Sequence, residues 1–371
     1  MLTAILFLIV LTILVFVHEL GHFLVAKWAK VRVDEFAIGF PPRLFSWTRG
    51  ETTYSLNLLP FGGYVKIFGE NPDEAVVGDS RNFASQHRLV QAAILLGGVA
   101  FNFLFAGLLF AAALTLGLTV PADYSGSLPL KDVSTQVVST LPGSPAEKAG
   151  LRTGDEIMGV SAPGTKLDDL SVESVQAFIA SHPGEPVSFH LKRGSQVGRG
   201  IIIEGGETIT VTPTEGVVAG KAAIGVSLAE LGTLKLGAGQ AFVEGFKMMG
   251  RTTAGVATGL WNFAAKAFSG RASVSEVTGP VGIATLVGHA SEFGFAYLLG
   301  FAAFISVNLG VINLIPFPAL DGGRLLFVAI EGALRRPLNP RILTITNAVG
   351  FVLLILLMIV VTWKDVAGLL K

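Results

Sequence analysis

The sequence contains no cysteine, which excludes disulfide bonds and thiolate metal sites, so any bound metal must be held by nitrogen and oxygen. Charged residues are scarce at 15%, against roughly 25% in an average soluble domain. Lysine plus arginine and aspartate plus glutamate balance at 27 each, so nothing favours a nucleic-acid partner. Hydrophobic residues make up 51% of the 371 and gather in blocks, which indicates an integral protein in contact with membrane lipid.

Four apolar runs are long enough to cross about 30 Å of hydrocarbon as helices, at residues 2–26, 89–120, 295–318 and 342–363. The first run lacks a basic leader and a small-x-small cleavage site, so we expect it to be retained. The connection after it carries eight basic residues: Lys27, Lys30, Arg32, Arg43, Arg49, Lys66, Arg81 and Arg88. Four arginines also separate the last two runs. By the positive-inside rule both connections are cytoplasmic, which places both termini outside.

The first run ends in a His-Glu-x-x-His pattern formed by His18, Glu19 and His22. On a helix the two histidines lie one turn apart on the same face, where two imidazoles can bind one metal ion. The alternative is a polar spot on a packed helix surface. Residues 2–17 contain one polar side chain, Thr12, so the motif lies at membrane depth. Ionisable groups are costly there unless they are partnered, which favours the metal site.

A second polar motif follows the third apolar run. Residues 313–323 read Asn-Leu-Ile-Pro-Phe-Pro-Ala-Leu-Asp-Gly-Gly, in which two prolines break the helix and two glycines permit tight turns. Irregular backbone at this depth is tolerated where it is buried in protein or lines a wet cavity. Asp321 is therefore a candidate third metal ligand, and the alternative is a cap or turn residue. The predicted topology brings both motifs to the cytoplasmic half of the bilayer.

The two motifs together, in this order and in a membrane setting, resemble the site-2 protease family of intramembrane zinc metalloproteases, of the regulator of sigma E protease type. The resemblance implies that His18, His22 and Asp321 bind Zn²⁺ and that Glu19 is the general base. It also implies a substrate cleft whose floor is shaped by Asn313, Pro316 and Pro318.

Residues 33–69 read as short strands separated by turn signals. They resemble the re-entrant β-hairpin of the family, which dips toward the active site and holds substrate through backbone hydrogen bonds. A small sheet that only caps the cytoplasmic end is the alternative. The hairpin residues expected at the cleft are Gly62, Gly63 and Tyr64.

The second apolar run contains Gly98 and Asn102, four residues apart. This spacing is typical of close helix packing in membranes. It also resembles a Gly-x-x-x-Asn motif of the family, although Val99 stands where proline usually follows the glycine. The resemblance makes Asn102 a candidate to steady the hairpin or the substrate backbone.

Residues 122–236 form a polar insertion, and residues 141–157 within it resemble a PDZ domain of the bacterial protease type. We expect a helix at residues 172–181 and strands near 187–191 and 209–212. A PDZ domain binds extended C-terminal peptides by strand addition, and the carboxylate-binding turn is expected at Ile224, Gly225 and Val226. Better-known relatives carry two such domains, whereas one fits this sequence.

Residues 237–270 combine an apolar stripe with a charged one, which favours a helix lying along the membrane surface over a fifth span. The expected fold is a polytopic α-helical membrane protein with four spans, a cytoplasmic-side β-hairpin and one extracytoplasmic α/β PDZ domain. Residues 1–120 and 271–371 form the two halves of the protease core.

The predicted function is zinc-dependent endoproteolysis within the transmembrane segments of single-span proteins, in the bacterial inner membrane. By resemblance, the substrates are proteins such as anti-sigma factors or remnant signal peptides. The PDZ domain is expected to bind their C-terminal peptides or to exclude bulky outer domains. Two alternatives stay open: a catalytically inactive PDZ scaffold and a metal transporter. The histidines outside the first run lie outside the predicted spans, which disfavours a transport path.

Overall fold

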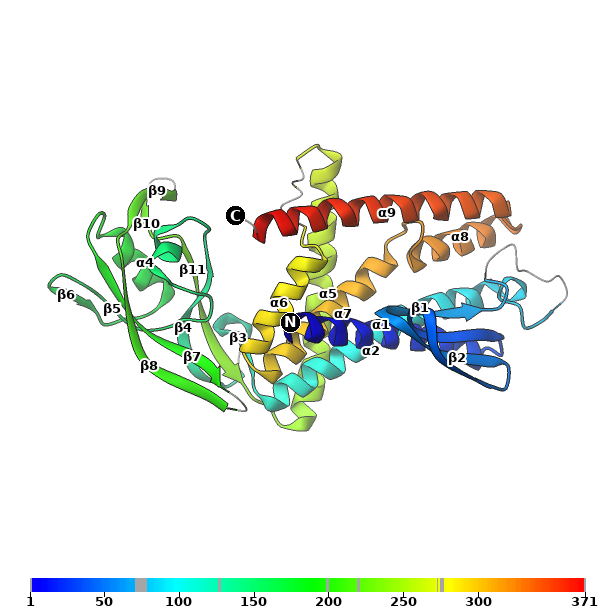
Figure 1. Ribbon diagram of the computed structural model, residues 1–371, viewed down its shortest axis with the longest axis horizontal. Coiled ribbons are helices and arrows are strands. Elements are labelled where there is room, and N and C mark those ends of the chain that lie inside the picture. Colours follow the sequence, from blue (N-terminus) through cyan, green and yellow to red (C-terminus); the bar gives the residue numbers. More distant parts are fainter. Residues whose placement is uncertain are drawn as a thin grey trace. The chain divides into compact units, whose positions relative to one another are not determined.

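The computed structural model describes residues 2–70, 79–125, 128–197, 200–218, 221–271, 273 and 277–369. The chain divides into two compact units, whose elements are labelled in Figure 1. Unit 1 comprises Met1–Ala113, Ala238–Ser291 and Leu298–Lys371. Unit 2 comprises Leu114–Gly237 and Glu292–Tyr297.

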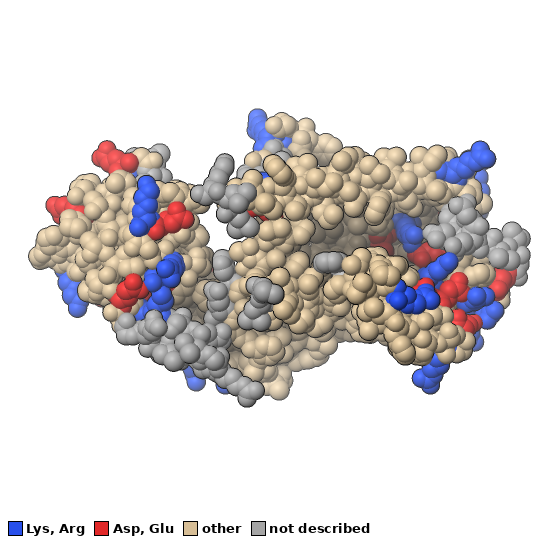
Figure 2. Space-filling view, viewed as in Figure 1, with Lys and Arg blue, Asp and Glu red and all other residues tan. Residues whose placement is uncertain are grey.

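Four helices in the described chain are long and apolar enough to cross a membrane: α1 (Leu2–Trp28), α2 (Arg88–Leu116), α7 (Phe295–Leu314) and α9 (Pro340–Leu369). They confirm the four apolar spans expected from the sequence. Figure 2 shows charged side chains of unit 1 gathered over the hairpin end, whereas the flanks of the long helices are largely uncharged. Many large apolar side chains of α9 are exposed, which suits a surface that faces lipid.

The ends of two spans differ from the sequence-based expectation. The helix α2 stops at Leu116 rather than near Val120, because Gly117 adopts a φ of 108° and turns the chain into a strand. The helix α7 stops at Leu314 rather than continuing to Pro318. Prolines at positions 316 and 318 cannot donate the backbone hydrogen bonds that would extend it.

The helices α1 and α2 approach each other closely at three glycines. A Cβ atom on Gly21 would lie 2.7 Å from the carbonyl carbon of Gly97 and 2.9 Å from Cα of Gly98. Small residues allow membrane helices to pack backbone against backbone. The helix α7 joins the pair through Ser306, whose hydroxyl donates to the carbonyl of Asn102 at 2.9 Å.

The helix α5 (Ala238–Phe268) carries the stretch expected to be amphipathic, and it is not among the four candidate spans. Figure 1 shows that it runs across the direction of α1, α2 and α9. It contacts α2 through Gly245, where a Cβ atom would lie 2.6 Å from the backbone nitrogen of Ala111. Its buried Glu244 pairs with Arg251 at 3.2 Å, so the charged stripe is partly neutralised within the helix.

Two strands, β1 (Val33–Arg49) and β2 (Thr52–Ile67), form the hairpin predicted from residues 33–69. Both strands bend, so the sheet has four segments. Residues 33–38 pair with 63–67 on one side and with 53–56 on the other, and residues 43–49 pair with 52–57. Residues 63–67 are therefore an edge segment, with no further strand beside them in the described part of the chain.

The hairpin packs along α1. The ring of Phe36 lies 5.7 Å from that of Phe16 and 5.2 Å from that of Phe23, measured between centroids. Thr12 of α1 also holds the hairpin, because its hydroxyl donates to the carbonyl of Pro60 in β2 at 2.9 Å. The sheet thus follows α1 past the turn that carries the two histidines.

The short helix α8 (Asp321–Leu334) folds back against the end of α7. A Cβ atom on Gly322 would collide with the carbonyls of Leu314 and Ile315, and one on Gly323 would collide with the carbonyl of Phe317. Only glycine permits this approach, and it fixes the position of Asp321 at the start of α8. The remaining elements of this unit are η2 (Phe83–Ser85) and α6 (Pro280–Glu292).

Unit 2 is a sheet with the order β3-β11-β4-β5-β7-β8, in which β6 pairs with β5. Its core packs Val160, Phe189 and Leu191 of the sheet against Val175 and Phe178 of one helix. Its elements are β3 (Leu118–Pro121), η3 (Ala122–Ser125), β4 (Leu130–Thr140), α3 (Pro145–Ala149), β5 (Glu156–Ala162), β6 (Thr165–Leu167), α4 (Val172–Ala180), β7 (Val187–Val197), β8 (Gly200–Val211), β9 (Thr214–Val218), β10 (Lys221–Ala223) and β11 (Val226–Leu234).

The helix and both strands expected within this unit are present, and the two strands are longer than expected. The helix α3 begins at Ser144, whose hydroxyl accepts from the backbone of Glu147, and ends at Gly150 with a φ of 93°. These cap residues lie in the segment that carries the PDZ resemblance.

Candidate metal centre

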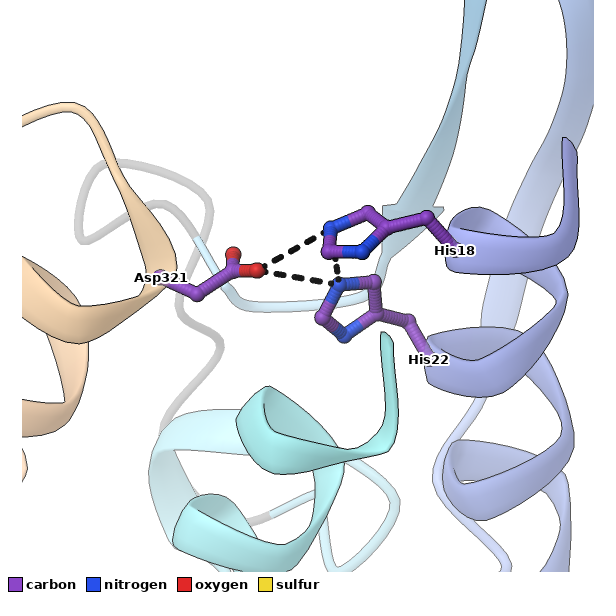
Figure 3. A group of neighbouring side chains, drawn as sticks. All are labelled: His18, His22 and Asp321. Atoms are coloured by element: carbon purple, nitrogen blue, oxygen red, sulfur yellow. Dashed lines mark hydrogen bonds and ion pairs between the residues drawn. The ribbon is translucent and has the colours of Figure 1, made fainter. Parts of the chain in front are cut away.

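Three side chains from two distant parts of the chain converge in unit 1. His18 and His22 lie one turn apart on α1, and Asp321 opens α8 (Figure 3). The Nε2 atoms of the two histidines are 3.2 Å apart. The carboxylate atom Oδ2 of Asp321 lies 3.1 Å from Nε2 of His18 and 3.3 Å from Nε2 of His22. Both histidines are 7% exposed, so solvent does not separate these polar atoms.

The hydrogen bond of His22 fixes its tautomer. Its Nδ1 lies 2.9 Å from the carbonyl oxygen of Ile94, which can only accept, so Nδ1 carries the proton. The Nε2 atom therefore offers a lone pair. Oδ2 of Asp321 is also buried, without a hydrogen-bond partner among the described residues. The lone pair of His22 Nε2 and the Asp321 oxygen face each other at 3.3 Å, which favours a cation between them.

The spacing of the three atoms fits zinc. Ligands about 2.0–2.2 Å from a tetrahedral zinc ion lie roughly 3.3–3.5 Å from one another. The observed separations of 3.1–3.3 Å are close to this spacing. Two imidazoles and one carboxylate are also a ligand set of catalytic zinc, which leaves a fourth position for water or substrate. In the described residues this is the one group of three or more histidine, aspartate or glutamate side chains with such convergence.

The three candidate ligands, His18, His22 and Asp321, line a polar cleft of about 490 Å³. Glu19 lines the same cleft, as do Tyr64 and Val65 on the edge segment of the hairpin. Arg324 and Glu70 also line the cleft and form an ion pair with each other. Figure 2 shows a hollow in unit 1 between α9 and the hairpin, with charged atoms inside it. The cleft therefore combines three candidate metal ligands, the separate carboxylate of Glu19 and the edge segment of the hairpin.

Glu35 holds Tyr64 in place at the cleft. Burial opposes ionisation of Glu35, but hydrogen bonds from Ser55 and Tyr64 and the charge of Arg43 outweigh it and lower its pKa below the ordinary value. Ser55 donates at 2.6 Å and Arg43 pairs at 2.6 Å. An ionised Glu35 thus fixes the tyrosine hydroxyl beside the cleft.

The other residues predicted for the cleft lie in different places. Gly63 borders it, since a Cβ atom there would lie 3.8 Å from Cγ of Glu19, and Gly62 packs on α1 with a φ of 104°. Asn102 is fully buried behind His18. Three predicted residues lie outside the cleft lining: Asn313 in the last turn of α7, Pro316 in the irregular segment that follows, and Pro318, which packs on Gly350 of α9.

Sequence reasoning did not include Glu70 and Arg324 in the site. Arg324 is three residues after Asp321, so helical spacing could have placed it on the same side of α8. Glu70 follows the hairpin without a motif of its own, and its pairing with Arg324 depends on the tertiary fold.

In unit 2, Ile224, Gly225 and Val226 lie at the start of β11. The carbonyl of Gly225 accepts from the backbone of Leu141 at 2.8 Å, and that of Ile224 accepts from Ala146 at 2.9 Å. The outer edge of β11 pairs with β3 only at residues 231–234. Residues before Leu231 thus have no strand on that edge within the described chain.

Four apolar helices around a buried His-His-Asp group, with a glutamate in the adjoining cleft, define a membrane metalloenzyme of the hydrolase type. The chain belongs to Peptidase family M50, whose model matches residues 6–357. A protein of Clostridium perfringens is 35% identical over 359 residues, covering 95% of each chain. The zinc metalloprotease RasP of Geobacillus kaustophilus is 32% identical over 431 residues, covering 97% of this chain and 96% of its own.

Proposed function

We propose that this chain is a zinc-dependent intramembrane endopeptidase in which His18, His22 and Asp321 hold Zn²⁺ and Glu19 is the general base. The observation that carries the proposal is the convergence of two Nε2 atoms and one carboxylate oxygen at 3.1–3.3 Å among apolar helices. Membership of Peptidase family M50 and the name zinc metalloprotease given to relatives such as RasP support it.

Zinc, when bound, supplies a Lewis acid that activates water and polarises a peptide carbonyl. The Glu19 carboxylate lies in the same cleft, takes a proton from the attacking water and delivers it to the leaving amine nitrogen. The Ile94 carbonyl keeps the proton of His22 on Nδ1, so that Nε2 stays available as a ligand. Both histidines are only 7% exposed, which limits the contact of the ligand atoms with bulk water.

The substrate is a transmembrane segment of a single-span protein. A transmembrane helix hides its amide groups, so the segment must unwind locally before cleavage. The edge segment 63–67 offers backbone groups with which an extended substrate can pair, and Tyr64 and Val65 line the cleft beside Glu19. Strand addition thus offsets part of the cost of unwinding. Substrate classes in keeping with this are anti-sigma factors and remnant signal peptides.

Unit 2 is a PDZ domain that selects substrates outside the membrane. Its support is the unpaired outer edge of β11 at residues 226–230, whose Val226 and Leu228 share a core with Val175 and Phe178 of α4. A C-terminal peptide would add to this edge beside α4. In this proposal unit 2 and both termini lie outside the bacterial inner membrane, with the three candidate ligands toward the cytoplasmic side; the distribution of basic residues between the connections supports this orientation.

The two alternative functions have weaker support. An inactive scaffold would not need Glu19 in the cleft beside three converging ligand atoms. A metal transporter would need further ligand groups along a path, and the described residues contain a single group.

The mechanism is tested with purified protein, a single-span reporter and a zinc assay. In Glu19→Gln we expect cleavage to fall about 10²–10⁴-fold with zinc still bound, because only the proton acceptor is lost. In Asp321→Asn we expect both zinc affinity and cleavage to fall. Glu173→Gln, at an exposed position of α4, is the matched control. Undiminished cleavage by Glu19→Gln would rule out this mechanism.

Substrate pairing is tested by disulfide cross-linking, for which the absence of native cysteine gives a clean background. In the Glu19→Gln chain, Val65→Cys is expected to cross-link to a cysteine near the reporter's cleavage site. Thr48→Cys on the outer segment 43–49 is the control and should not react. Equal cross-linking at both positions would contradict strand addition at the cleft.

A further inference from the structure

One face of α2 lies directly behind the two histidines. Residues Ile94, Gly98 and Asn102 occur at successive turns of α2, so they share this face. The carbonyl of Ile94 accepts from Nδ1 of His22 at 2.9 Å. The amide of Asn102 lies 3.0 Å from Nδ1 of His18. Each imidazole therefore has one partner on α2, through the ring nitrogen that points away from Asp321.

Gly98 lies between these two partners. A Cβ atom there would overlap Nε2 of His22 and lie 2.8 Å from Cε1 of His18. A side chain at this position would push both rings toward Asp321 and alter the spacing of the ligand atoms. The glycine is thus required by the rings as well as by helix packing.

The orientation of the Asn102 amide decides what His18 can do. If its NH₂ group donates to Nδ1, the His18 proton must reside on Nε2, between the other ligand atoms, where it blocks metal binding. A half-turn of the amide gives the same shape, and Oδ1 then accepts from Nδ1–H. The Nε2 lone pair of His18 is thereby free for a metal.

The backbone of Asn102 is held independently of its side chain. The hydroxyl of Ser306 on α7 donates to the Asn102 carbonyl, and Asn102 has no exposed surface. A buried asparagine among apolar helices is costly unless its polar atoms are used. Its burial also separates it from the cleft, which is lined by other residues.

We propose that this face of α2 orients the zinc ligands, with Asn102 Oδ1 acting on His18 as the Ile94 carbonyl acts on His22. Both imidazoles are then held as Nδ1–H tautomers with Nε2 directed at the metal. Asn102 is a positioning residue, rather than the contact to substrate or hairpin expected from the sequence. This inference rests on the proposed zinc site. It also explains the Gly-x-x-x-Asn spacing: Gly98 leaves space for both imidazole rings, and Asn102 provides a hydrogen-bond acceptor for His18.

The test compares two substitutions by zinc competition titration of the full chain in detergent. Asn102→Leu keeps the approximate shape and removes the acceptor, so zinc affinity should fall about 10–100-fold, as for other groups that orient metal ligands. Asn102→Asp keeps an acceptor oxygen and should stay within a few-fold of wild type. Asn308→Leu is the matched control, because Asn308 on α7 donates only to the carbonyl of Phe304 among its described contacts.

Cleavage kinetics distinguish a residue that positions a zinc ligand from one that contacts the substrate. For Asn102→Leu, saturating zinc should restore most of the cleavage rate with an unchanged KM. Unchanged zinc affinity combined with a raised KM would overturn the proposal and make Asn102 a substrate contact. Failure of the wild-type chain to bind zinc would instead refute the proposed function.

A second measurement needs no variant and so does not depend on correct folding. In zinc-loaded wild-type protein labelled with ¹⁵N-histidine, both ligand imidazoles should show a protonated Nδ1 and a metal-bound Nε2. A zinc-loaded protein in which His18 binds through Nδ1 would overturn the proposal.

Discussion

Replacing Gly21 by alanine tests whether the spacing of α1 and α2 controls the metal site. Gly21 lies between the two histidine ligands in sequence and against Gly97 and Gly98 in space. Alanine favours a helix over glycine by about 0.8–1 kcal/mol, so α1 itself should not be weakened. Any loss of function must then come from the contact between the helices.

The size of the effect follows from the contact distances. The added Cβ would lie 2.7 Å from the Gly97 carbonyl carbon and 2.9 Å from Gly98 Cα, whereas ordinary contact begins near 3.4 Å. The helices must therefore separate by at least about 0.7 Å, since the carbonyl oxygen of Gly97 would lie closer still and backbone atoms cannot rotate away. This shift moves both imidazoles relative to Ile94 and Asp321. A misplacement of about 1 Å can cost roughly 10²-fold in rate, so we expect cleavage to fall about 10–100-fold.

The assay measures reporter cleavage and zinc affinity of the Gly21→Ala chain together. Gly255→Ala on α5 is the control, because a Cβ atom there would meet no described atom within 4 Å. We expect weaker zinc binding and slower cleavage in Gly21→Ala, and neither change in Gly255→Ala. Wild-type cleavage and zinc affinity in Gly21→Ala would refute the claim that this helix contact sets the metal geometry.

Three further outcomes are expected. Removing the metal with a chelator should abolish cleavage and lower the free energy of unfolding. The expected loss is about 2.7 kcal/mol, compared with protein in zinc at 100 times its Kd. Adding zinc back should restore both properties, measured by reporter cleavage and thermal unfolding. In Gly63→Ala the new Cβ would lie 2.6 Å from the Ala37 carbonyl, so cleavage should fall while zinc affinity stays unchanged in a competition titration. In unit 2, Asp155 is 1% exposed and its hydrogen bonds raise the pKa of Arg193, which also pairs with Glu207. Asp155→Ala should therefore cost about 1.5–3 kcal/mol, measured as faster hydrogen exchange in β5 and β7. Unchanged exchange there would contradict the last expectation.

The sequence predicted the elements whose signals are local. The four apolar runs became four long helices because hydrophobic length alone marks a span. The helix at residues 172–181 and the hairpin at 33–69 followed from periodicity and turn residues. The convergence of His18, His22 and Asp321 was also predictable, because each motif has a recognisable residue pattern in a membrane setting.

Other features depend on tertiary packing and had no local signal. The sequence did not reveal that Asn102 faces His18 rather than the cleft, since this depends on how α2 is rotated against α1. The pairing of Glu70 with Arg324 joins residues more than 250 positions apart. The end of α2 at Leu116 depends on a positive φ at Gly117, which an apolar sequence run does not disclose.

The central claim is that two imidazoles and one carboxylate hold a single zinc ion within the membrane helices. X-ray absorption at the zinc edge of the purified chain tests it most directly. We expect one zinc per chain with only nitrogen and oxygen ligands, about 2.0–2.2 Å away, and the scattering pattern of two imidazoles. Asp321→Asn should weaken the site, and His22→Ala should leave one imidazole. A wild-type spectrum with a single imidazole, or purified protein that binds no zinc, would show that these three side chains do not form the site.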